Sequence, residues 1–286
     1  MKRSLLKRSL RKRSLFLGIG VLLLASLSVA CDGSRETSAV PPPENPPAEA
    51  PGDKPPTDAP PETETPATIE TVWGIDTASI VDETFYACVK KHFGAPAFVG
   101  RYLVTKEGVS YGITQEEARF LHGQGAKIVP IYNHFTNATT YERGAAEAKE
   151  AIRMAEEAGI PEGVAIFADI EPDYPVDADF LRGWTETMLQ SPYVPGVYAV
   201  FVKASESEAL SSYLSFAWHH PEPASRLAVW TSDVDVGVTT KAKAPDKYEP
   251  EAEAVTAVDI WQYGIDAETC NIDTNLMRAE AMKLLW

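Results

Sequence analysis

Residues 164–171, with the sequence VAIFADIE, decide the fold of this chain. The segment is apolar up to its end and rich in β-branched residues, which predicts a buried strand. Side chains alternate between the two faces of a strand, so one face carries only aliphatic side chains and suits packing under helices. The other face runs from Phe167 to Asp169 and Glu171. An aromatic start followed by two carboxylates is typical of the inside of a parallel barrel at its catalytic mouth.

Asp169 and Glu171 predict acid–base chemistry at the end of this strand. Residues two apart on a strand lie roughly 6–7 Å apart at Cα, so each negative charge disfavours the other. One carboxyl can then stay protonated near neutral pH while its neighbour stays ionised, as acid catalysis on a glycosidic bond requires. The alternative interpretation is a solvated strand end where two acids happen to fall.

The rest of residues 70–286 alternates strand patterns with helix patterns. Strands are expected at 72–76, 97–103, 127–132, 164–171, 196–201, 227–230, 260–263 and 271–275. Helices are expected at 82–92, 114–125, 139–159, 180–189 and 206–218, the third of them opened by a capping box at Thr139 and Glu142. This alternation predicts an α/β fold with a parallel sheet. Because residues 231–254 are polar and interrupted by proline, we expect a modified, irregular TIM-like β/α barrel that lacks some helices near its end.

Residues 1–30 are expected to form a lipoprotein signal peptide. Seven basic residues and no acid precede an apolar run at 15–30, which is short for a membrane span and typical of a signal-peptide core. The sequence LSVAC at 27–31 resembles a bacterial lipobox, in which the cysteine, here Cys31, is lipidated and becomes the mature N-terminus. The departure is Ser28, where a leucine is usual. The alternative is an ordinary secretory signal cut near Ala30.

Residues 31–69 are expected to form a disordered tether rich in proline and glutamate. Eleven of the 22 prolines lie between Pro41 and Pro66, and no apolar periodicity appears. Such a segment cannot bury enough surface to fold, and its polyproline II character would give it a reach on the order of 100 Å. The tether would carry a folded domain at 70–286 away from a membrane and into a cell wall, although simple low-complexity filler is the alternative.

Charge and cysteine content narrow the choice of partners. The net charge of −15 becomes about −22 once the seven basic residues of the leader are removed. A protein this acidic is not expected to bind nucleic acid through its general electrostatic field.

With Cys31 lipidated, Cys88 and Cys270 remain for a compartment in which disulfides persist. Barrel closure would bring their two segments together and allow a disulfide. Two buried free thiols are the alternative.

Six short motifs then occur in order along the chain. They are GID at 74–76, PIY at 130–132, DIE at 169–171, GVY at 196–198, WQY at 261–263 and IDTN at 272–275. This ordered set resembles the glycoside-hydrolase-like domain of unknown function, a relative of the family 25 lysozymes (muramidases). The resemblance covers about residues 72–286. One departure is AVWTS at 228–232, which lacks the Trp-x-Ala-x-Tyr ending common in the lysozymes.

The resemblance implies a barrel with four acids at its mouth, Asp76, Asp169, Glu171 and Asp273. The last residue of the Asp-x-Glu element is the proton donor in family 25, which implies that role for Glu171. Asp169 would stabilise the positive charge that develops on the sugar, while Asp76 and Asp273 would position substrate or water. The family 25 lysozymes cleave peptidoglycan, so the implied partner is a cell-wall glycan.

Aromatic residues at strand ends are candidates for stacking on sugar faces, although an aromatic in such a position is more often a core residue. The candidates are Tyr132, Tyr198, Trp230, Trp261 and Tyr263.

Competing functions have less support in the sequence. A metal-dependent deacetylase needs histidines at short ligand spacing, and the five histidines form no such pattern. A serine hydrolase would show a Gly-x-Ser-x-Gly motif, which is absent. A non-catalytic wall-binding protein that retains the barrel remains open, although none of the four acids is missing. We therefore expect an exported, membrane-tethered, monomeric glycoside hydrolase of cell-wall glycan that needs no metal or cofactor.

Overall fold

The structure is a computed structural model that describes residues 69–286 except 204, 206, 253, 254 and 256. The predicted signal peptide, Cys31 and the tether up to residue 68 lie outside the described residues. A search of the described helices finds none that is both long and apolar enough to span a bilayer.

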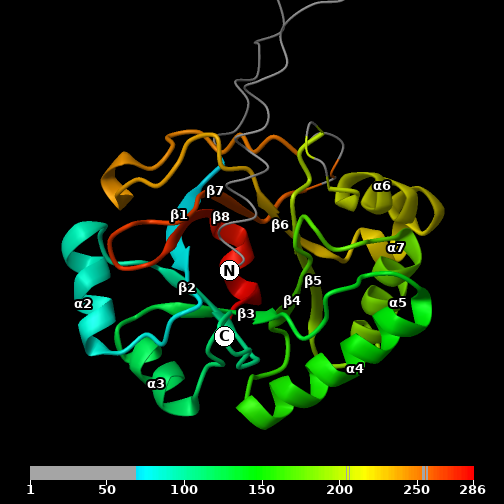
Figure 1. Ribbon diagram of the computed structural model, residues 1–286, viewed down its shortest axis with the longest axis horizontal. Coiled ribbons are helices and arrows are strands. Elements are labelled where there is room, and N and C mark those ends of the chain that lie inside the picture. The colour runs from blue at the N-terminus through cyan, green and yellow to red at the C-terminus, as the bar shows by residue number, and fades with distance from the viewer. Residues whose placement is uncertain (1–68, 204, 206, 253–254, 256) are drawn as a thin grey trace, which may run out of the picture. The chain divides into compact units, whose positions relative to one another are not determined.

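Eight strands close into a barrel in which each strand pairs with the next one along the chain (Figure 1). The strands are β1 (Thr71–Asp76), β2 (Phe98–Tyr102), β3 (Lys127–Tyr132), β4 (Ala165–Asp169), β5 (Val194–Ala199), β6 (Ala228–Ser232), β7 (Ile260–Gly264) and β8 (Asp273–Arg278). Successive strands from β1 to β7 run parallel to one another, whereas β8 is antiparallel to both β7 and β1. The predicted irregular barrel is confirmed. Its irregularity lies partly in β8, which follows β7 through a short loop because antiparallel strands need no crossover helix.

Helices surround the barrel on the side of β1 to β6 (Figure 1). They are α2 (Glu83–His92), α3 (Gln115–Gly123), α4 (Tyr141–Ala158), α5 (Ala178–Met188), α6 (Ala209–His219) and the short α7 (Pro221–Ala224). Of the two 3-10 helices, η2 (Lys241–Lys243) lies between β6 and β7, whereas η3 (Ala279–Leu284) follows β8 and, coloured red, lies in the middle of the ring of strands in this view (Figure 1). In the described part of the segment between β6 and β7, the only helix is η2. The polar, proline-interrupted composition of that segment had predicted this gap in the helical layer.

Side chains cap the N-termini of four helices, α2, α3, α4 and α5. Gly159 closes α4 in the left-handed conformation at φ 72°, as predicted. The capping box predicted at Thr139 was wrong by one residue, because Thr140 is the N-cap and its hydroxyl accepts from the Arg143 N–H. The Asp177 carboxylate, which itself caps α5, also accepts the Thr140 N–H. This tertiary contact selects Thr140 over its neighbour.

Helices α4 and α5 touch through two glycines. A Cβ atom built on Gly144 would overlap the carbonyl oxygen of Phe180, and one built on Gly183 would overlap that of Tyr141. Each helix thus offers a bare backbone patch to the other. Close contact of this kind explains why glycine, a poor helix former, stands inside both helices.

Two apolar layers lie on opposite faces of the strands, as the alternation in β4 predicted. Ala165 and Phe167 belong to the core inside the barrel. The aliphatic face belongs to the larger core between strands and helices, and consists of Val164, Ile166, Ala168 and Ile170. Side chains that follow Phe167 on its face therefore point to the barrel mouth.

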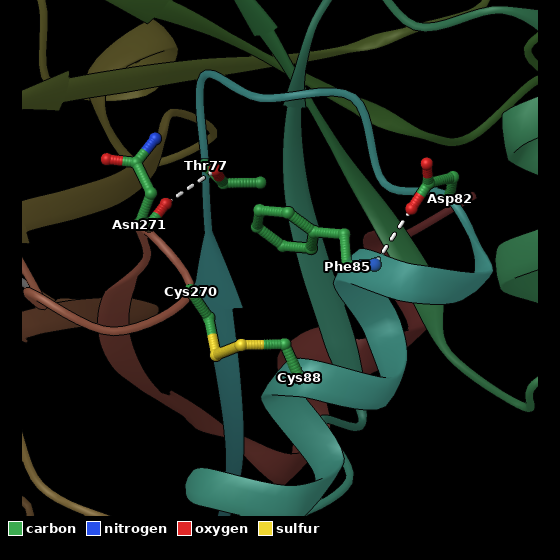
Figure 2. Close-up of a disulfide and its surroundings, with 6 residues drawn as sticks. All are labelled: Thr77, Asp82, Phe85, Cys88, Cys270 and Asn271. Carbon is green, nitrogen blue, oxygen red and sulfur yellow. Dashed lines mark hydrogen bonds between the residues drawn. A yellow bond between two sulfur atoms is a disulfide. The ribbon is translucent and has the colours of Figure 1, made fainter.

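Cys88 in α2 and Cys270 in the loop before β8 form a disulfide across 182 residues (Figure 2). Next to it, the Thr77 hydroxyl donates to the carbonyl oxygen of Asn271 at 2.8 Å. The Asn271 amide group donates to the Ser79 hydroxyl, also at 2.8 Å. The loop between β7 and β8 is therefore fastened both to α2 and to the segment that follows β1.

Candidate active site

A cavity of about 590 Å³ opens at the carboxyl ends of the parallel strands. All four acids named from the sequence line it: Asp76, Asp169, Glu171 and Asp273. Asp76 and Asp273 are almost 200 residues apart in sequence but are register partners across the antiparallel β1–β8 pair. The barrel therefore brings together carboxylates from three distant parts of the chain.

Asp76, at the end of β1, is held by two side-chain amides. Its Oδ2 accepts the Gln262 Nε2–H at 2.9 Å and the Asn275 Nδ2–H at 2.8 Å. All three side chains are buried, with 4% or less exposed. Donors of this kind suit an ionised carboxylate, which has only acceptor oxygens.

The two amides are themselves oriented by donors from neighbouring strands. Gln262 Oε1 accepts the hydroxyls of Tyr198 at 2.7 Å and Ser232 at 2.8 Å. Asn275 Oδ1 accepts the indole N–H of Trp230 at 3.0 Å. These contacts fix which end of each amide faces Asp76, so the carboxylate is preorganised by a network from β5, β6, β7 and β8.

Space beside Asp76 depends on a glycine in the next strand. A Cβ atom on Gly100 would lie 2.7 Å from Asp76 Cβ and 2.9 Å from the Trp230 ring. Real Cβ atoms do not approach other carbons that closely. Glycine at position 100 therefore lets the carboxylate and the indole share one layer of the barrel mouth.

Asp169 is the last residue of β4, Glu171 lies two residues beyond it, and both line the cavity. Asp169 is 1% exposed and Glu171 is half-buried. Their charges reach two tyrosines that also line the cavity, the mouth tyrosines Tyr102 and Tyr198. The pKa of each mouth tyrosine is raised well above its ordinary value, first by removal from water and then by the negative charges of Asp76, Asp169 and Glu171. Three of the four acids thus act on the same small volume.

Asp273 begins β8 on the opposite side of the mouth. Its Oδ1 accepts the backbone N–H of Asp266 at 2.6 Å, which ties the first residue of β8 to the loop before it. That loop adds Asp266 and Asn271 to the cavity wall. The disulfide at Cys270 anchors the same loop.

Only two of the five aromatic candidates line the cavity, Tyr198 and Trp230. Tyr132, Trp261 and Tyr263 belong to the core between the strands and the helices, so the prediction that they stack on sugar was wrong.

Each of these three aromatics has a structural partner outside the barrel. Tyr132 donates its hydroxyl to Glu147, Trp261 donates its indole N–H to the backbone oxygen of Asp233, and the Tyr263 hydroxyl accepts the Trp73 indole N–H. Strand alternation could have revealed this, because successive side chains of a strand face opposite sides. Their neighbours Ile131 and Gln262 face the cavity, so these three aromatics face away from it.

Sequence reasoning missed one whole wall of the cavity. The loop between β2 and α3 contributes every residue from Thr105 to Tyr111, and the mouth tyrosine Tyr102 precedes it. A small hairpin pairs Lys106 with Ser110, and Gly108 at its tip has φ 69°. The polar residues around Gly108 were the available signal for a turn, but nothing in them pointed to the cavity.

A buried ion pair between Arg101 and Glu117 lies behind the β2–α3 loop and binds the backbone of that loop. Arg101, with no exposed surface, donates from Nε to Glu117 Oε1 at 2.6 Å. Its remaining donors reach the carbonyl oxygens of Thr77 at 2.8 Å and Tyr111 at 3.1 Å. Glu117 Oε1 also accepts the Val81 N–H at 2.9 Å. The pair therefore joins α3 to two segments that line the cavity.

One group of three described carboxylates lies close enough to share a cation, with ligand atoms within 4.8 Å of one another. It consists of Asp233, Asp235 and Glu251, which do not line the cavity. Asp233 already accepts the backbone N–H of Glu251 at 2.8 Å, and burial raises the pKa of its carboxyl. The Asp233 carboxylate therefore has a structural role, in which it holds together the segment that follows β6.

Several solved structures resemble this chain. The solved structure of an uncharacterised protein from B. stearothermophilus is 34% identical with a TM-score of 0.72, covering 75% of this chain and 100% of that one. A muramidase from Acremonium alcalophilum is 15% identical with a TM-score of 0.49, covering 74% of this chain and 96% of that one. A family GH25 lysozyme from Aspergillus fumigatus is 13% identical with a TM-score of 0.47, covering 75% and 98%. A search of curated proteins finds no match.

The family resemblance read from the six motifs is confirmed over residues 95–277, which contain five of those motifs. The model of the family described as "Rv2525c-like, glycoside hydrolase-like domain" matches residues 95–277, which is more than half of the chain. The chain belongs to this Rv2525c-like family of glycoside hydrolase-like domains.

Proposed function

We propose that this protein is an exported, membrane-tethered glycoside hydrolase that cleaves peptidoglycan-type cell-wall glycan by carboxylate acid catalysis. The observation that carries the proposal is the meeting of Asp76, Asp169, Glu171 and Asp273 in one cavity at the carboxyl end of the barrel. Membership of a glycoside hydrolase-like family supports the reaction class. Active sites of β/α barrels lie at this end of the strands.

Glu171 is the proton donor in this proposal. It lies just beyond β4, half-buried at the cavity, where a leaving sugar oxygen can reach it. Asp169 is buried two residues earlier and supplies the negative charge that stabilises the positive charge of the transition state. Asp76, fixed by the Gln262 and Asn275 amides, positions the sugar or a water molecule, and Asp273, its register partner on β8, does so beside it.

The N-terminal leader is the feature that supports export and tethering. A basic segment, an apolar run and Cys31 after small residues fit a lipid anchor, and residues 31–69 give the reach toward a wall. Replacing Cys31 by alanine should release the protein from isolated membranes into the soluble fraction. Unchanged membrane retention of Cys31→Ala would contradict the anchor while leaving the catalytic proposal intact.

The decisive experiment incubates the purified full-length chain with purified peptidoglycan and identifies new reducing ends by mass spectrometry. Glu171→Gln keeps the shape and hydrogen-bonding capacity of the side chain but cannot deliver a proton, so turnover should fall by about 10²–10⁴-fold. The matched control is Glu162→Gln, because Glu162 is exposed and precedes β4 at the opposite end of the strand. This control should cleave like the unaltered protein.

Two outcomes would contradict the proposal. Full cleavage by Glu171→Gln would remove Glu171 as proton donor. Absence of cleavage by the unaltered protein on every wall glycan, combined with retention on insoluble peptidoglycan, would favour a glycan-binding protein that keeps the barrel without turnover.

A further inference from the structure

We propose that the loop between β2 and α3 gives the cavity a subsite for a sugar that carries a carboxylate. Lys106 would bind the carboxylate, and the ring of Tyr111 would pack against the sugar. This inference rests on the proposed function, since it names the class of glycan that the same cavity accepts.

The first observation is the charge of the cavity. Six carboxylates are found among its described lining residues, and Lys106 is the single cation among them. Nothing described in residues 69–286 forms a hydrogen bond or ion pair with the Lys106 ammonium group. A half-buried lysine that pairs with none of the surrounding acids retains its three donors for a ligand.

The second observation is that hydrogen bonds fix the backbone of the hairpin that carries Lys106. Its N–H donates to the Ser110 carbonyl oxygen at 2.8 Å, and the Ser110 N–H donates back to the Lys106 oxygen at 3.0 Å. The Ser110 hydroxyl donates to the Val104 carbonyl oxygen and accepts from the Asn133 amide at 3.0 Å. Little loop entropy is then lost when a ligand binds, which favours affinity.

The third observation concerns Tyr111, which is 57% exposed although its backbone is fixed on both sides. The Tyr111 N–H donates to the Ala78 oxygen at 3.0 Å, and its carbonyl oxygen accepts from Arg101 at 3.1 Å. An exposed aromatic ring on a fixed backbone at a cavity offers a ready apolar surface with a polar tip. It lies in the same hairpin wall as Lys106.

Electrostatics then selects the ligand. The acids around the cavity leave it negatively charged even with Glu171 protonated as the proton donor. They repel an anionic sugar from most of the cavity, so such a sugar can bind only where a cation offsets the repulsion. Lys106 marks that place and so sets the position of the charged sugar along the cavity. The carboxylate can come from a substituent of the sugar ring or from a peptide attached to the glycan, and both present the same group to an ammonium.

The test compares Lys106→Met, which keeps the side-chain stem without its charge, with Lys149→Met on the exposed face of α4 as matched control. Binding and cleavage are measured on three probes: peptidoglycan strands with their peptides, the same strands with peptides removed, and neutral N-acetylglucosamine oligomers. A lost charge-assisted hydrogen bond should weaken Lys106→Met on carboxylate-bearing strands by about 10–100-fold, seen in KM or Kd. Neutral oligomers and the Lys149→Met control should show no change.

Each pattern of results decides the question. Loss on both kinds of strand supports a carboxylate on the sugar, whereas loss only on strands with peptides supports a peptide carboxylate. Equal effects on charged and neutral probes, or no effect, would overturn the subsite. Charge-dependent binding without cleavage would leave the subsite standing and refute the proposed hydrolysis, whereas no binding of any probe by the unaltered protein would refute both.

Discussion

The disulfide between Cys88 and Cys270 should contribute a large part of the stability of the barrel. Its cross-link spans 182 residues. In the chain-entropy treatment a loop of that length corresponds to roughly 5 kcal/mol at 25 °C. The total free energy of unfolding of a domain is about 5–15 kcal/mol. The double variant Cys88→Ser/Cys270→Ser of the full chain should therefore unfold at a markedly lower temperature.

The expected shift follows from the size of the folded part. For a domain of about 200 residues, 1 kcal/mol moves Tm by roughly 2–4 °C, so the double variant should lose about 10–20 °C. Calorimetry on the oxidised protein, the dithiothreitol-reduced protein and the double variant measures this directly. Reduction should lower Tm of the unaltered protein to that of the variant and leave the variant unchanged.

Two results would refute this reasoning. A Tm within about 2 °C for the oxidised and reduced proteins would show that the reduced chain keeps the two segments together by other contacts. A reduced protein much less stable than the double variant would show that the thiols, rather than the lost cross-link, are responsible. Serine at both positions separates these cases, because it keeps the size of the side chains without the bridge.

Three further perturbations test other parts of the structure. Arg101→Met leaves the Glu117 carboxylate buried without its cation, so urea denaturation should show a loss of about 3–5 kcal/mol, part of which Arg101→Met/Glu117→Gln recovers. Gly144→Ala forces α4 away from α5 and should cost about 1–3 kcal/mol in the same assay, whereas Gly123→Ala, with open space around it, should be neutral or stabilising. The mouth tyrosines have folded pKa values above the unfolded value of about 10, so their stabilising contribution is complete below pH 10 and is lost as pH rises through the folded pKa. Urea titrations at pH 8–11 should show a shallower alkaline loss once both are replaced by phenylalanine, and an unchanged slope would contradict this.

Local patterns in the sequence located all eight strands, although some predicted bounds were shifted, with 196–201 against Val194–Ala199 for β5 and 271–275 against Asp273–Arg278 for β8. The segment 127–132 matches β3 residue for residue, and alternation within 164–171 assigned both faces of β4 correctly. The positions of Asp169 and Glu171 followed from the same pattern, whereas Asp76 and Asp273 were assigned to the mouth only through the family resemblance. The antiparallel direction of β8 was not predicted, because a strand pattern does not encode the direction of its neighbour.

The walls of the cavity could not be predicted because distant residues determine them. The hairpin at 105–111 is set by Asn133 from after β3, by Ala78 from after β1 and by Arg101 beneath it. The three misassigned aromatics failed for another reason. Core packing and sugar stacking use the same side chains, so only the face of the strand distinguishes them, and that face depends on the strand register.

The segment 77–81, directly after Asp76, connects the two walls of the cavity. Toward the β2–α3 wall, its backbone binds Arg101, Glu117 and the Tyr111 N–H. Toward the β7–β8 wall, its hydroxyls bind Asn271, which the disulfide holds from the other side. Asp76 itself is fixed from below by amides of the barrel, so the carboxylate and the walls rest on separate contacts. Changes in the β2–α3 wall can then alter the shape of the cavity while Asp76 keeps its position.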